Sequence, residues 1–145
     1  MTAPQESPVT QLSEADSWSR LSGITLGRLA TSVDGQPDIF PVNFVVQRKT
    51  ILIRTAEGTK LAAAVVNQRV AFEADEHDVE AGWSVVVKGH ARVLSGSDAI
   101  ADAESAQVLP WTATPKQRFI RIVPTQITGR QFLFGTEPDY FLDLG

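Results

Sequence analysis

The sequence predicts a mainly β fold, an antiparallel barrel of about six or seven short strands accompanied by two or three short helices. Three observations support this class. Apolar and polar residues alternate over several short segments, as they do in strands with one buried face. Residues typical of tight turns, above all Asp34-Gly35, separate these segments. Between them lie short stretches with helical spacing of apolar residues. A β-sandwich is the alternative that this pattern leaves open.

The first half of the chain predicts one helix and three consecutive strands. Ser13 is a typical helix N-cap, and apolar residues at helical spacing follow it as far as position 21. Pro41 has no N–H for a β-ladder, so its strand should be an edge strand or be bulged there. The expected elements are a helix over 13–22 and strands over 27–33, 38–46 and 50–55.

The second half returns to strands after a short apolar helix. Its clearest strand covers 83–94, where Trp83, Val85 and Val87 share one face while Lys88 and His90 share the other. The expected elements are a helix over 59–67, strands over 69–74 and 83–94, a helix over 97–106, and strands over 119–123 and 127–134.

Composition places the chain in one domain and excludes several classes of function. The chain has 145 residues, of which 43% are hydrophobic, so we expect a flexible tail over 1–11 and a single domain over 12–145. A net charge of -4 argues against nucleic acid as a partner. The absence of cysteine excludes disulfides and thiolate metal sites. No apolar run approaches the ~20 residues of a membrane helix, and we expect a cytoplasmic protein with no membrane partner.

The strand expected over 38–46 is apolar on both faces, which one small barrel cannot bury. A second copy of the chain could cover the outer face, so the sequence predicts a homodimer. The apolar residues concerned are Ile39, Phe40, Val42, Phe44, Val45 and Val46.

The junction between the third strand and the next helix has the chemistry of an anion site. Arg54 and Thr55 end the strand, and Gly58, Thr59 and Lys60 open the helix. The first turn of a helix offers free N–H groups, and hydroxyl, ammonium and guanidinium groups add donors for phosphate oxygens. The alternative is an ordinary helix cap flanked by solvated charges.

The two histidines and the other reactive side chains give weaker signals. His77 lies among acidic residues and could join a metal site, although a solvated loop is the simpler interpretation and no metal site is predicted. His90 is either a haem ligand or a surface or interface histidine. No nucleophile motif is present, and no catalytic residue is assigned.

Taken in order, these segments resemble the pyridoxamine 5′-phosphate oxidase-like family of FMN-binding split barrels, in particular its short, oxidase-related branch of actinobacterial type. The resemblance covers the chain from about Leu12 to Phe134. The segments that carry it are Gly27-Arg28-Leu29-Ala30, Pro41-Val42-Asn43-Phe44, the run from Ile53 to Leu61, Arg69-Val70-Ala71-Phe72-Glu73, Gly82-Trp83-Ser84 and Ile127-Thr128-Gly129-Arg130.

The resemblance implies a split β-barrel homodimer with FMN at the subunit interface. By this resemblance, the phosphate is held by Arg54, Thr55, Thr59 and Lys60. The flavin ring would lie against Pro41, Val42 and Asn43, with Trp83 and Ser84 reaching it from the neighbouring strand. Arg130 would approach from the other subunit, and Trp111 would either stack on the ring or serve as an interface aromatic.

The chain departs from the true oxidase at its end, where residues 137–144 are acidic and apolar instead of basic. We therefore do not predict oxidation of pyridoxamine phosphate. A related branch binds a deazaflavin coenzyme, for which Arg48, Lys49, Lys60 and Lys88 could form a basic groove. The expected function is an NAD(P)H-linked flavin oxidoreductase acting on a small-molecule substrate. The alternative is a non-catalytic protein that binds or stores flavin, deazaflavin or haem.

Overall fold

The computed structural model describes residues 7–56, 59–65, 68–109 and 117–135, and within them the chain forms seven strands and three short helices. The mainly β prediction is confirmed. The strands are β1 (Val9–Leu12), β2 (Leu26–Val33), β3 (Gln36–Gln47), β4 (Thr50–Ala56), β5 (Arg69–His77), β6 (Ala81–Val93) and β7 (Gln117–Leu133). The helices are α1 (Glu14–Ser22), α2 (Lys60–Ala64) and α3 (Ser97–Ser105).

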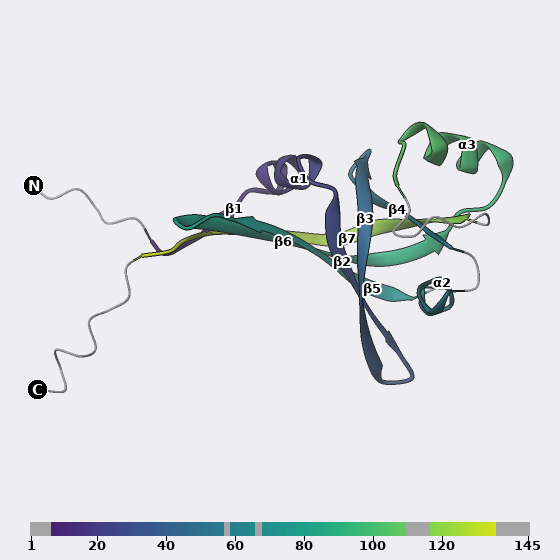
Figure 1. Cartoon of the computed structure of the whole chain (residues 1–145), viewed down its shortest axis with the longest axis horizontal. Coiled ribbons are helices and arrows are strands. Elements are labelled where there is room, and N and C mark those ends of the chain that lie inside the picture. Colours follow the sequence, from purple (N-terminus) through teal and green to yellow (C-terminus); the bar gives the residue numbers. More distant parts are fainter. Residues whose placement is uncertain (1–6, 57–58, 66–67, 110–116, 136–145) are drawn as a thin grey trace, which may run out of the picture.

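Six of the strands close into a ring in the order β7-β4-β3-β2-β5-β6, and β6 pairs back with β7. All of these pairs are antiparallel. β7 pairs with β4 through its first residues and then runs on along β6, while β1 adds to its far end. Figure 1 shows this far end extending to one side and the β2–β3 hairpin projecting away from the body. The arrangement is a split β-barrel, as predicted.

Local chemistry explains the first helix and the two tight turns. The Ser13 hydroxyl accepts the backbone N–H of Asp16 at 3.1 Å, so the predicted N-cap is confirmed. Asp34 and Gly35 have φ angles of 51° and 76°, the left-handed pair that a two-residue hairpin needs. Arg48 and Lys49, at 49° and 54°, make the second such turn. These turns fix the register of the β2–β3–β4 meander.

The barrel interior is filled from every strand of the ring. Phe44 and Phe72 meet edge to face with their centroids 4.7 Å apart. α1 packs against β3, β6 and β7, and α2 packs against β2 and β4. A second, smaller cluster lies outside the ring beneath α3 and consists of Leu52, Ala103, Val108 and Phe119.

Two predicted boundaries are wrong. Residues 9–11, expected in the tail, belong to β1 and pair with residues 130–132 of β7. Their side chains are exposed, so backbone pairing forms this strand without an apolar pattern to reveal it. The two strands expected over 119–123 and 127–134 are one continuous strand, β7.

A β-bulge carries β7 past Pro124, which lies between the two strands expected from the sequence. Lys88 pairs with Gln126 but Gly89 pairs with Pro124, so Thr125 is the extra residue. The Thr125 hydroxyl donates to the Lys88 carbonyl oxygen at 3.1 Å. Proline lacks an N–H for the ladder and is tolerated at such an irregularity.

Candidate functional site

The hydroxyls predicted to hold a phosphate lie together where β4 ends and α2 begins. Thr59 is the N-cap of α2, and its hydroxyl accepts the N–H of Ala62 at 3.1 Å. The same hydroxyl donates to the Ala56 carbonyl at 2.9 Å and lies 3.3 Å from Oγ1 of Thr55. These bonds hold two donor-bearing side chains in fixed positions at the start of the helix.

The two predicted cations of this site lie in different surroundings. Lys60 is exposed and forms an ion pair with Asp38 of β3, with Nζ and Oδ2 3.1 Å apart. Arg54 precedes Thr55 and therefore points to the opposite face of β4. There its guanidinium lies over the Phe119 ring at 5.4 Å, and its buried Nε has no hydrogen-bond partner in the described part of the chain. The structure thus brings Thr55, Thr59 and Lys60 together and places Arg54 on the outer face. Residues 57 and 58 lie outside the described residues.

The predicted ring-binding strand presents mainly backbone and small polar groups. Val42 is buried in the barrel interior, whereas Pro41 is exposed and Asn43 is half-buried on the outer face. Pro41 pairs with β2, while β4 pairs with β3 only from Phe44 onward. At Pro41 the strand is therefore a local edge, as predicted.

Trp83, Ser84 and Arg130 lie on neighbouring strands but face different surroundings. Trp83 is buried in the interior, whereas Ser84 is opposite Arg130 of β7 in the ladder. The Ser84 hydroxyl donates to a Glu73 carboxylate oxygen at 3.2 Å. Ser84 and Arg130 of one chain are thus close together, while Trp83 contributes to packing.

A charge network continues from Ser84 across the outer face. Arg28 donates to Glu73 at 2.9 Å and to Asp75 at 3.2 Å. Burial is the main cause that raises the pKa of Glu73, and the neighbouring Asp75 carboxyl raises it further, whereas Arg28 acts in the opposite direction. The acidic side chains of this part of the sheet are thereby paired with a cation.

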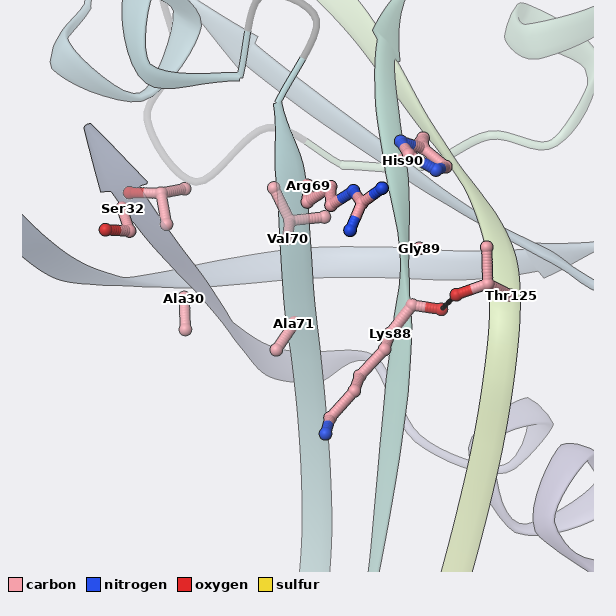
Figure 2. Close-up of a pocket in the computed structure, with 10 residues that line it drawn as sticks. Ala30, Ser32, Arg69, Val70, Ala71, Lys88, Gly89, His90 and Thr125 are labelled. Atoms are coloured by element: carbon pink, nitrogen blue, oxygen red, sulfur yellow. Dashed lines mark hydrogen bonds between the residues drawn. The ribbon is translucent and has the colours of Figure 1, made fainter. Parts of the chain in front are cut away.

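Beside this network lies a cavity of about 620 Å³ that the sequence did not reveal. It is formed over β2, β5 and β6, with the bulged residue of β7 at its rim (Figure 2). Its lining residues are Ala30, Thr31, Ser32, Arg69, Val70, Ala71, Lys88, Gly89, His90 and Thr125. None of the ten predicted site residues is among them.

The sequence predicted one part of this cavity and missed the rest. Alternation along 83–94 correctly placed Lys88 and His90 on one face. The register that sets Ala30 beside Ala71 joins β2 to the consecutive strands β5 and β6, which lie far along the sequence, and it could not be deduced.

The remaining candidates gain no support as metal sites. His77 lies near the Phe134 ring, with centroids 6.3 Å apart. No group of three or more histidine or carboxylate side chains within the described ranges could hold a metal ion.

Trp111 lies outside the described residues. Within those same ranges, no helix has the length and apolar character needed to cross a membrane.

Residues 13–131 match the model of the pyridoxamine 5′-phosphate oxidase family, so the chain belongs to that family. An uncharacterised protein of Mycobacterium tuberculosis is 56% identical over 95 residues, which cover 66% of this chain and 86% of the relative. An FAD-binding protein from Mycobacterium smegmatis is 55% identical, with a TM-score of 0.81 over 87% of this chain and all of the other (100%). An FAD-binding protein from Mesorhizobium loti is 25% identical, with a TM-score of 0.69 over 85% of this chain and 97% of the other.

Proposed function

We propose that this protein binds a flavin nucleotide, FAD or FMN, and acts as an NAD(P)H-linked oxidoreductase on a small molecule. The observation that carries the proposal is the 55% identity to the FAD-binding protein of Mycobacterium smegmatis over 87% of the chain. Membership of the pyridoxamine 5′-phosphate oxidase family agrees with it. The absence of cysteine fits action in the cytoplasm.

The residues at the β4–α2 junction fit the phosphate that adjoins the ribityl chain, which FAD and FMN share. Thr55 and Thr59 supply fixed hydroxyls, and Lys60 supplies a positive charge on an exposed, movable side chain. The flavin would rest against the outer face of β3 at Pro41 and Asn43. When bound, it would accept and pass on hydride. The chain's own residues would hold and orient it.

The flavin is proposed to lie between two copies of the chain. The β2–β3 hairpin projects from the barrel (Figure 1), with Ile39 70% and Val33 40% exposed. Apolar side chains on a projecting hairpin are typical of a surface that a partner covers. Light scattering coupled to size-exclusion chromatography should give twice the mass of the chain, and a monomer at micromolar concentration would contradict this part of the proposal.

The first experiment is the absorbance spectrum of the purified protein, with mass spectrometry of the released ligand to distinguish FAD from FMN. Addition of NADH or NADPH should bleach the flavin bands, and air should restore them. A flavin that is held but not reduced by either donor would contradict the oxidoreductase and leave a binding protein. A colourless protein that takes up neither nucleotide would contradict flavin binding itself.

Substitution at the β4–α2 junction tests where the phosphate lies. Lys60→Ala should weaken flavin binding by about 1.5–3 kcal/mol, the usual contribution of a hydrogen bond to a charged group. Arg92→Ala is the matched control, because it removes one exposed positive charge from β6. Equal effects of the two substitutions in fluorescence titrations would show that the phosphate is not bound at Lys60.

A further inference from the structure

We infer that the cavity over β2, β5 and β6 is a second binding site, separate from the flavin site, for an organic anion with a flat apolar body. Its volume of about 620 Å³ lies within the range of small-molecule sites, roughly 300–1,000 Å³. Three cationic or protonatable side chains surround it, Arg69, Lys88 and His90. The inference rests on this cavity alone and does not require the flavin.

In the part of the chain that the structure describes, no acidic side chain is paired with Arg69, Lys88 or His90. Within the described residues, none of the three forms an ion pair or a side-chain hydrogen bond. In Figure 2, the Arg69 side chain extends toward β6 and the Lys88 side chain toward β5. A few residues away on the same outer face, Arg28 is fully paired with Glu73 and Asp75. Unpaired side chains such as Arg69 and Lys88, in a chain of net charge -4, favour an anionic ligand.

The floor between the cations suits a flat apolar group. Ala30 lies beside Ala71, and Ala71 lies beside Lys88, so two adjacent strands present only methyl groups there. A larger side chain at either alanine would fill the space. The apolar floor would exclude water from one side of a planar ligand, and the cations would bind its charged end.

Hydroxyl groups complete the lining of the cavity. The bulge in β7 brings Thr125 to the rim, where its hydroxyl already donates to the Lys88 carbonyl. Thr31 is 4% exposed, and alternation along β2 places its side chain on the interior face with Leu29, so its hydroxyl does not face the cavity. Ser32 is exposed on the same face of β2 as Ala30, so its hydroxyl is available to a ligand in the cavity.

The test uses 2-naphthoate as the probe and NMR of the two histidine rings of the full chain as the readout. The chain has two histidines. His90 lines the cavity, whereas His77 lies beside Phe134 and serves as an internal control. We expect a saturable shift of the His90 ring signals and none at His77. Absence of a saturable His90 shift, or equal shifts at both rings, would overturn the inference.

Three substitutions assign the binding to the cavity. Arg69→Gln and Lys88→Gln should each weaken naphthoate binding about tenfold or more, as expected for loss of a charge-assisted hydrogen bond. Arg92→Gln removes an exposed charge from the same face of β6 without lining the cavity and should leave binding unchanged. Ala71→Leu should block naphthoate. Equal losses in Arg92→Gln and Lys88→Gln would show a general field effect and overturn the site.

Competition with flavin distinguishes the two sites. FAD added to saturation should leave the naphthoate-shifted His90 signal in place. Displacement of naphthoate by FAD, with both affinities lowered in Arg69→Gln, would show that the cavity is the flavin site and overturn its separateness. If flavin binding fails altogether but naphthoate still shifts His90, the inference stands and the proposed function falls.

Discussion

The β4–α2 junction and the cavity over β2, β5 and β6 both collect cations and hydroxyls, but only the junction satisfies them internally. At the junction, Lys60 is paired with Asp38, and the Thr59 hydroxyl is engaged in two hydrogen bonds. In the cavity, Arg69 and Lys88 have no acidic partner among the described residues. The junction lysine therefore has a counterion within the chain, whereas the cavity cations have none among the described residues.

The presence or absence of an internal counterion affects how an anion binds at the junction and in the cavity. A phosphate at the junction must compete with Asp38 for Lys60, so part of the attraction offsets the lost ion pair. An anion in the cavity meets no such competitor among the described residues. The junction is therefore suited to a ligand fixed by several contacts, and the cavity to a ligand attracted mainly by charge.

The largest expected effect tests whether the bulge in β7 shapes the cavity. In Gly89→Ala, the new Cβ would clash with the Val123 carbonyl oxygen and lie 2.9 Å from Cα of Pro124. Because these are backbone atoms, β7 must shift, and we expect a loss of about 1–3 kcal/mol in the free energy of unfolding. Urea denaturation measures this loss, and naphthoate binding should fall with it.

Gly23→Ala is the control for this substitution. A Cβ at Gly23 would meet only the Arg20 carbonyl oxygen at 3.6 Å, an ordinary contact distance. Its free energy of unfolding should therefore change little. If Gly89→Ala is as stable as Gly23→Ala, the close crossing of β6 and β7 does not determine the shape of the cavity.

The contrast between the β4–α2 junction and the cavity also explains which features could be predicted from the sequence. The junction is continuous in sequence, so Thr59 could be recognised as a cap from its neighbours alone, and the cap is confirmed. The Asp34-Gly35 turn was predictable for the same reason. The cavity depends on the register of β2, β5 and β6 and on one bulged residue, Thr125, which no local pattern encodes.

The same reasoning accounts for the errors. The strands expected over 119–123 and 127–134 are one strand, because a bulge in the pairing of β7 with β6 accommodates Pro124 between them. Arg54 was predicted to join Thr55 at the phosphate because a guanidinium suits phosphate oxygens. Alternation along β4 places the two side chains on opposite faces, and the role of Arg54 at the phosphate stays a prediction to be tested. β1 escaped detection because its side chains are exposed and its stability comes from pairing with β7.

A smaller effect is expected from the cap at the junction. Thr59→Val removes the hydroxyl that accepts the N–H of Ala62, and should lower the free energy of unfolding by about 1 kcal/mol. Thr59→Ser keeps the hydroxyl and should restore most of this stability. Urea denaturation compares the two variants. Naphthoate binding should be the same in both, and a change there would mean that the junction and the cavity are not independent.

The smallest expected effect tests whether Asp38 competes with the phosphate for Lys60. Asp38→Asn removes the carboxylate 3.1 Å from Nζ, and because the pair is exposed it contributes only about 0.2–1 kcal/mol. Flavin binding should therefore tighten by up to roughly fivefold in fluorescence titrations, the opposite sign to Lys60→Ala. Asp34→Asn, which removes a negative charge from the tip of the same hairpin, should leave the affinity unchanged. The gain should disappear in the Asp38→Asn/Lys60→Ala double variant, since the two side chains act on the phosphate through one interaction. A gain that persists without Lys60 would show that Asp38 repels the phosphate directly, and the junction would then differ from the cavity by its negative charge and not by competition for a cation.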